Sequence, residues 1–170
     1  MKADERPWVV AVSAFPFEGA ARTAIHQFKF RHRLVLAEFF GLQLAEAWRK
    51  YSQEFQPDAI VPIPLHWLRR LWRGYNQSWE AAVCLGNELG IPVRKYLRRT
   101  KKTQPQSTLN ARERQKNLRG VFTATHNVEG MKLLLLDDVF TTGATLTNAA
   151  NTLLKAKAHS IAVITIARDL

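Results

Sequence analysis

Residues 133–145 constrain the fold of this chain more than any other stretch. Four consecutive leucines are followed by two aspartates, a short turn rich in threonine and glycine, and an Ala- and Leu-rich segment. An uninterrupted apolar run of this length is typical of a strand buried on both faces, as in a parallel sheet covered by helices. The stretch therefore predicts a buried strand, a tight turn and a helix within an α/β domain.

The turn between this strand and helix has the features of a phosphate-binding loop. Backbone N–H groups at the start of a helix attract anions, and Gly143 lets the main chain approach one without a Cβ in the way. Threonine hydroxyls add donors that suit phosphate oxygens. The residues expected to hold a phosphate are Thr141, Thr142, Gly143, Ala144 and Thr145.

The acidic pair Asp137 and Asp138 precedes the turn and must contact another part of the ligand, because carboxylates repel phosphate. Two adjacent carboxylates at a strand end accept hydrogen bonds from two neighbouring hydroxyls, or hold a hydrated Mg²⁺. A ligand with a phosphate and a vicinal diol, such as a ribose 5-phosphate, fits this arrangement. The competing interpretation is an ordinary strand, turn and helix with two solvated aspartates.

A second strand, predicted over residues 59–64, is followed by a basic loop and a helix over 78–89. Loops that follow parallel strands meet at the carboxyl edge of the sheet, so this loop is expected beside the threonine turn. We expect the last of its arginines and one of the two earlier ones to pair with an anion, while backbone N–H groups near its glycine add donors. The alternative is a solvated basic loop anchored by tryptophans. The candidate anion ligands, which the family resemblance described below assigns to a pyrophosphate, are Arg69, Arg70, Arg73 and Gly74.

Residues 94–119 carry most of the charge of the chain. They contain ten Lys or Arg residues and one Glu, a net +9 of the total +11. Such a segment cannot bury itself, and we expect a long mobile loop over about residues 98–118. It is either a lid that closes over a polyphosphate and excludes water, or a contact surface for nucleic acid.

The length of 170 residues is enough for one domain with a full hydrophobic core. Cys84 is the only cysteine, which excludes an intrachain disulfide and a cysteine-based zinc site, and its apolar setting indicates a packing residue. No apolar run approaches the roughly 18 residues of a membrane span, and no signal-peptide pattern is present at the N-terminus. We therefore expect a cytoplasmic protein that is not an integral membrane protein.

The remaining elements follow from local periodicity. We expect residues 1–57 to form an N-terminal strand and helical segment that pack on a core of residues 58–170. The predicted strands are 8–14, 93–97, 121–124, 131–137 and 160–167, and the further predicted helices are 18–30, 34–55 and 145–157.

Taken together, these segments resemble the ComF family of competence-associated proteins, and the threonine turn resembles the signature loop of type I phosphoribosyltransferases. The resemblance implies an α/β fold with a single Rossmann-like domain, a mainly parallel central sheet flanked by helices, and a long basic flexible loop. Family members commonly begin with a cysteine-rich zinc module, which this sequence lacks. The matching segments are Lys29, residues 58–65, 73–77, 103–104 with Leu109, 112–117, 120–122 and the signature loop.

The resemblance also implies a ligand, phosphoribosyl pyrophosphate (PRPP). Catalytic Asp137 and Asp138 would take the ribose hydroxyls, and the threonine turn would take the 5-phosphate. Mg²⁺ would arrive with PRPP and reach the acid pair through water, without a direct protein ligand. The lid would include Lys101, Lys102, Arg112 and Arg114.

The implied function is Mg-dependent transfer of a phosphoribosyl group to an unknown acceptor, with release of pyrophosphate, in a protein associated with DNA uptake or utilisation. One alternative is a non-catalytic protein of the same fold that binds single-stranded DNA. Against it, Tyr96 is the only aromatic residue between Val93 and Val121, so that segment has no stacking ladder. Another is a regulator that senses PRPP and acts through a competence or DNA-uptake protein.

Overall fold

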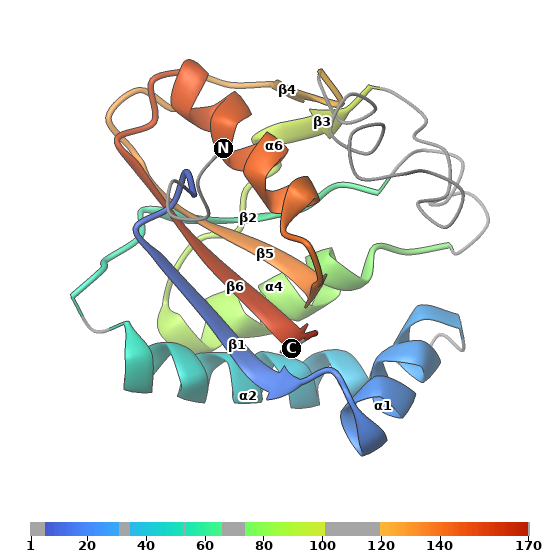
Figure 1. Ribbon diagram of the computed structural model, residues 1–170. Helices are drawn as coiled ribbons and strands as arrows, with labels where there is room; N and C mark the ends of the chain where they lie inside the picture. The colour runs from blue at the N-terminus through green and yellow to red at the C-terminus, as the bar shows by residue number, and fades with distance from the viewer. Residues whose placement is uncertain (1–5, 31–34, 53, 66–73, 101–119, 170) are drawn as a thin grey trace.

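The helices and strands of the chain alternate in the manner of a parallel α/β sheet (Figure 1). The computed structural model describes residues 6–30, 35–52, 54–65, 74–100 and 120–169. In chain order the elements are β1 (Val10–Pro16), α1 (Gly19–Phe30), α2 (Val35–Tyr51), β2 (Ala59–Pro62), α4 (Gln77–Leu89), β3 (Leu97–Arg99), β4 (Phe122–Ala124), β5 (Lys132–Phe140), α6 (Ala144–Lys155) and β6 (Ser160–Arg168).

The central sheet has the strand order β1-β6-β5-β2, and each neighbouring pair is parallel. β5 lies between β6 and β2, and its leucines 133–136 are all 0% exposed. Strands β3 and β4 form a separate antiparallel pair. The prediction of a mainly parallel sheet with an apolar central strand is confirmed.

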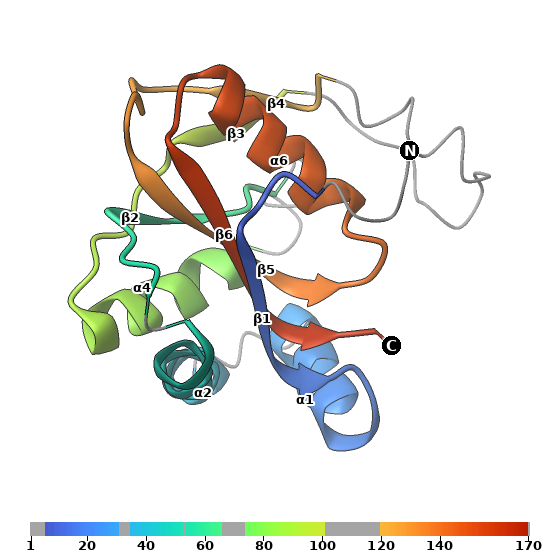
Figure 2. The ribbon, with the colours of Figure 1, turned by 60° about the vertical axis from the view of Figure 1, so that its left-hand side comes forward.

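Helices cover both faces of the sheet, as Figures 1 and 2 show. α2 and α4 pack on one face, where they meet Leu134 and Leu136. α6 and the β3–β4 pair lie over the other face, which presents Leu133 and Leu135. Consecutive leucines therefore serve two different cores, which explains why the run is uninterrupted rather than alternating with polar residues.

The crossing of α2 and α4 depends on a glycine. A Cβ placed on Gly41 would collide with the Cβ of Cys84, so only glycine lets the two helices approach this closely. Burial raises the pKa of the Cys84 thiol, and the charges of nearby glutamates raise it further. Cys84 is therefore a packing residue with little thiolate character.

Some element boundaries differ from the predictions because sheet pairing extends them. β5 continues to Phe140, beyond the end predicted at Asp137, because its last residues pair with β6. Asp137 and Asp138 are thus part of the sheet and not of the turn. β1 likewise continues to Pro16 by pairing with β6. Separately, the second helix is shorter than predicted and ends at Tyr51. The N-terminal segment therefore supplies an edge strand of the central sheet.

The basic segment is partly ordered by strand pairing. The strand predicted over 93–97 is wrong, since Val93 makes only one parallel bridge, to Ile60, and β3 begins at Leu97. Arg98 and Arg99, which were assigned to the start of the flexible loop, pair with β4 instead. The rest of that loop, residues 101–119, lies outside the described residues. No helix in the described part of the chain is long and apolar enough to cross a membrane.

Candidate functional site

The acidic pair lies in the last half of β5 and is held by two neighbouring groups. The Oγ of Ser78, in the first turn of α4, donates a hydrogen bond to Asp137 Oδ1 at 3.3 Å. The backbone N–H of Asp138 donates to the same oxygen at 2.9 Å. Asp137 is therefore fixed by α4 from one face of the sheet, while its Oδ2 accepts no hydrogen bond from the described residues.

Asp138 forms an ion pair with Lys29 at the end of α1. The Lys29 Nζ lies 2.7 Å from Asp138 Oδ2, and each side chain is only 20% exposed. The end of α1 is itself docked on the loop before α4, because the Tyr75 hydroxyl donates to the Phe28 carbonyl and Gln77 Nε2 donates to the Lys29 carbonyl. Three elements distant in the sequence therefore meet at the acid pair.

Lys29 and Ser78 contact the acid pair, and the sequence assigned neither of them a role there. Lys29 was part of the family resemblance, and Ser78 was predicted only to start a helix. The sequence feature that could have identified Lys29 is its position in the last turn of an amphipathic helix. It did not identify the partner, because that depends on how α1 docks on the sheet.

The charge of the acid pair depends on pH near neutrality. Burial, and after it the charge of the adjacent Asp138 carboxylate, raise the pKa of Asp137 from 3.8 to about 7. The hydrogen bond from the Asp138 N–H, the charge of Lys29 and the Ser78 hydroxyl oppose this rise. Asp137 can therefore gain or lose a proton in the range where most enzymes work.

The threonine loop leads from β5 into α6 through a left-handed glycine. Gly143 has φ of 75° and precedes the first residue of α6. A Cβ on Gly143 would lie 2.9 Å from Cζ of Phe140, so the ring and the loop are in close contact. The Thr142 hydroxyl accepts a hydrogen bond from the Ala144 N–H at 3.3 Å. The threonine loop therefore enters α6 through a glycine turn that packs against the Phe140 ring.

A small hollow of about 40 Å³ lies between the threonine loop and Asp137. It is lined by Asp137, Val139 and residues 141–146, and Asp138 is not among the lining residues. Thr141 and Thr142 are exposed, while Thr145 is half-buried. The structure therefore brings one of the two predicted carboxylates and the whole predicted phosphate loop to a single opening.

The basic loop after β2 is described only at its end. Gly74 has φ of 76°, and Asn76 caps α4 by accepting a hydrogen bond from the Ser78 N–H at 3.1 Å. The predicted pyrophosphate ligands Arg69, Arg70 and Arg73 lie outside the described residues. The same is true of the predicted lid residues Lys101, Lys102, Arg112 and Arg114.

A larger cavity of about 710 Å³ lies between the start of α4 and the β3 strand. Gly74 and Tyr75 line it from the basic loop, and Trp79 lines it from α4. The Lys95 ammonium stands 4.5 Å from the centroid of the Trp79 ring, a cation–π contact. The cavity therefore combines aromatic rings with cations, to which Arg98 and Arg99 add two more.

Comparison with known proteins shows the family and the fold of the chain. A sequence profile described as the phosphoribosyl transferase domain matches residues 78–170. The "DNA utilization protein YhgH" of Salmonella typhimurium is 34% identical and matches 96% of this chain and 74% of its own. "Competence protein F" of Haemophilus influenzae is 33% identical over 85% of this chain and 66% of its own.

The fold has a counterpart among solved structures. Glutamine PRPP amidotransferase from B. subtilis, in complex with ADP and GMP, matches with a TM-score of 0.55 at 18% identity. The match covers 82% of this chain and 30% of that enzyme, and at this identity it speaks for the fold alone. With the domain profile and the two relatives, it leads to one conclusion: the chain belongs to the ComF family and has the type I phosphoribosyltransferase fold.

Proposed function

We propose that the chain binds PRPP and transfers its phosphoribosyl group to an acceptor, with release of pyrophosphate. The observation that carries this proposal is the hollow in which Asp137 meets the threonine loop. A ligand that extends from Asp137 to this loop needs a group that donates hydrogen bonds at one end and an anion at the other. A ribose with a 5-phosphate has both, and the phosphoribosyl transferase profile over residues 78–170 agrees with it.

In this proposal the two ribose hydroxyls donate to the acid pair. Both internal hydrogen bonds to Asp137 use Oδ1, and Lys29 contacts Oδ2 of Asp138. Each carboxylate therefore keeps one oxygen without a hydrogen-bond partner among the described residues. Two open oxygens on adjacent residues match the two hydroxyls of a vicinal diol.

The acid pair could also contact Mg²⁺ through the water molecules that the ion coordinates. Among the described residues, no three His, Cys, Asp or Glu side chains gather as a metal site would need. The open oxygens of Asp137 and Asp138 suit the coordinated waters of Mg²⁺, which retains several waters when it binds through phosphates. When bound with PRPP, Mg²⁺ would neutralise charge on the pyrophosphate leaving group.

The residues of the chain would act through position and charge. Departure of pyrophosphate leaves positive charge on the ribose ring, and the acid pair is the anionic group that holds that ring. We propose that the arginines of the basic loop and the backbone near Gly74 hold the leaving group, and that residues of the 101–119 segment close over it. These roles rest on the sequence pattern.

Calorimetry with PRPP and Mg²⁺ tests the binding step. We expect the double variant Asp137→Asn with Asp138→Asn to bind PRPP at least about tenfold more weakly, because two charged acceptors are lost. Glu129→Gln is the matched control, since Glu129 is an exposed acid paired with Lys157 elsewhere on the surface. Absence of binding to the native chain, or equal binding by the double variant, would refute the proposal.

Turnover needs a separate measurement, because binding alone does not identify the acceptor. Release of pyrophosphate should be followed with PRPP, Mg²⁺ and a panel of nucleobases and amines. Release that depends on one acceptor supports the transferase. PRPP binding without release from any acceptor favours the non-catalytic alternative, in which PRPP is sensed and the response passes to a competence or DNA-uptake protein.

Contact with single-stranded DNA is a second candidate function, favoured by the larger cavity. The sequence of the basic segment offered only Tyr96 for base stacking, but the fold brings Trp79 and Tyr75 to the same cavity as Arg98 and Arg99. Aromatic rings beside cations suit successive bases and phosphates. The names of the two relatives, one for DNA utilisation and one for competence, accord with this candidate.

Fluorescence anisotropy of a labelled oligonucleotide, measured at several salt concentrations, tests this candidate. Affinity should fall steeply with salt, and Lys95→Gln should weaken binding and reduce the salt slope by about one. Lys50→Gln is the matched control, because Lys50 also stands over an aromatic ring, at 5.1 Å from the Tyr51 centroid, but lies away from the cavity. Equal effects of the two substitutions would exclude this cavity as the DNA contact.

A further inference from the structure

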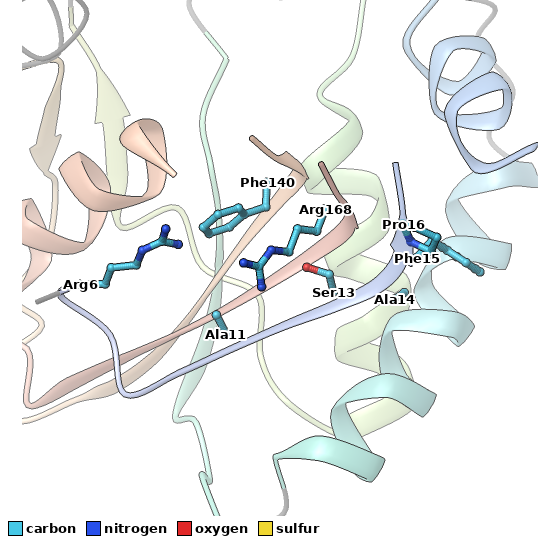
Figure 3. Close-up of a pocket in the computed structure, with 8 residues that line it drawn as sticks. All are labelled: Arg6, Ala11, Ser13, Ala14, Phe15, Pro16, Phe140 and Arg168. Atoms are coloured by element: carbon cyan, nitrogen blue, oxygen red, sulfur yellow. The ribbon is translucent and has the colours of Figure 1, made fainter. Parts of the chain in front are cut away.

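A separate cavity of about 360 Å³ opens at the carboxyl ends of β1 and β6. Figure 3 shows Arg6 and Arg168 reaching toward the Phe140 ring, with Ser13 and Ala11 of β1 beside them. None of the described residues that line this cavity is acidic. Its lining therefore has two positive charges and no charge to balance them.

The two arginines are aligned by one aromatic ring. The Cζ atom of Arg6 lies 4.9 Å from the Phe140 centroid, and that of Arg168 lies 5.4 Å from it. Arg6 also stands 5.6 Å from the centroid of Trp8, which meets Phe140 edge to face. A guanidinium that stands over a ring keeps its N–H groups in its own plane, where they point outward and remain available to a ligand.

Neither arginine has an ionic partner within the described part of the chain. The ion pairs found there involve Lys29, Arg49 and Lys157. Two like charges that converge on one ring repel each other unless an anion lies between them or water screens them. Arginine forks match the oxygens of a phosphate group in a bidentate manner, which makes phosphate the anion that this arrangement fits best.

This cavity is distinct from the threonine-loop hollow. The two share no lining residue. The ring of Phe140 separates them, since it contacts the arginines and also packs against Gly143. A phosphate bound by the arginines would therefore lie behind the loop that we propose to hold the 5-phosphate of PRPP.

We propose that the cavity between Arg6 and Arg168 is a second anion-binding site, which takes a phosphate group. The site does not depend on the transferase proposal, because its ligands come from the N-terminal segment and the end of β6. Ser13 adds a hydroxyl at its floor, held by a 2.7 Å hydrogen bond with Thr165. The ring of Phe140 contacts both arginines and Gly143, so it physically connects this site to the threonine loop.

The test is an NMR titration of the ¹⁵N-labelled chain with inorganic phosphate. The Nε–H signals of Arg6 and Arg168 report on the new site, and the amide of Gly143 reports on the threonine loop. Arg22 is an internal control, because it stacks on Phe17 at 5.8 Å without a second arginine or a cavity. We expect Arg6 and Arg168 to follow one binding curve and Arg22 to remain unchanged.

Two variants separate the sites. Thr142→Asp places a carboxylate in the threonine loop, so the Gly143 response should be lost while both arginine responses persist. Arg168→Gln should weaken phosphate binding at Arg6 about tenfold or more, with the Gly143 response intact. An unchanged urea midpoint for Arg168→Gln would show that the fold is retained, and Arg168→Lys, which keeps the charge, should bind with an intermediate affinity.

The inference is overturned by either of two results. If Arg6 and Arg168 shift no more than Arg22, the cavity binds no phosphate. If their shifts disappear in Thr142→Asp, phosphate binds only at the threonine loop and the arginines sense it through Phe140.

Discussion

Lys29 sets the charge balance of the acid pair. Its ammonium lies 2.7 Å from Asp138, and both side chains are largely covered. Removal of one member of a buried pair leaves an uncompensated charge, which costs far more than the loss of a surface pair. The Lys29 contact should therefore be measurable both in stability and in ligand binding.

Replacement of Lys29 by Met should lower the free energy of unfolding by about 1–3 kcal/mol, because Asp138 loses its partner while remaining mostly covered. Lys157→Met is the matched control, since the Lys157–Glu129 pair is 72% and 58% exposed and should contribute at most about 1 kcal/mol. Urea denaturation of the two variants measures the difference. Equal losses would mean that the Lys29 ion pair behaves as a surface pair.

The raised pKa of Asp137, about 7 in the folded chain, makes stability depend on pH. Between about pH 4 and pH 7 the folded chain retains a proton that the unfolded chain has released, so stability falls as pH rises through this window. Unfolding free energies from urea should be about 1–3 kcal/mol larger at pH 5 than at pH 8. Asp137→Asn should abolish most of this difference, and an unchanged pH slope in that variant would assign the effect to another group.

At the level of elements, the unit formed by β5, the threonine loop and α6 was the most predictable part of the chain. Its pattern is local, since leucines, acids, turn and helix follow one another without a gap. The Lys29–Asp138 pair was not predictable, because it depends on how α1 docks against Tyr75 and Gln77. The cavity around Trp79 and the arginine pair on Phe140 were missed for the same reason: each unites residues from separate segments.

Gly143→Ala tests the contact between the threonine loop and the Phe140 ring. The alanine would have to adopt a left-handed backbone conformation, and its methyl group would lie 2.9 Å from the ring. We therefore expect the free energy of unfolding to fall by about 2–4 kcal/mol and PRPP to bind more weakly. Gly130→Ala is a close control, since Gly130 has the same φ of 75° but no atom within 4 Å of an added Cβ. It should lose only about 1–2 kcal/mol.

That comparison is made by urea denaturation and by calorimetry with PRPP. If the two alanine variants lose equal stability, the ring contact contributes nothing beyond backbone strain. If Gly143→Ala binds PRPP as well as the native chain, the threonine loop does not hold the 5-phosphate.

At the scale of the whole molecule, the N-terminal segment completes both the sheet and the site. The family profile matches only residues 78–170, yet β1 pairs along the length of β6 and α1 supplies Lys29. α2 packs beside α4 on the same face of the sheet, through Phe40 and Leu44. Residues 58–170 alone would thus expose a large part of the apolar core.

We therefore expect a chain of residues 58–170 to lack cooperative unfolding. Loss of α2 and β1 removes a large area of buried apolar surface. The free energy that this burial contributes exceeds the net stability of a domain, which is about 5–15 kcal/mol. Thermal unfolding followed by circular dichroism, with dye binding to exposed apolar surface, measures this. Removal of residues 1–5 alone is the control and should leave the transition intact, whereas a sharp transition in the 58–170 chain would show that it folds independently.

The pairing of β1 with β6 also determines when the central sheet can be completed during synthesis. Ser13 and Thr165, which share a hydrogen bond across these two strands, are 152 positions apart. β1 must therefore wait, unpaired, until the 152 positions up to its partner strand have been synthesised, and contacts of such long range slow folding. Until β6 follows, the whole of β1 lacks the backbone partners that the folded chain supplies.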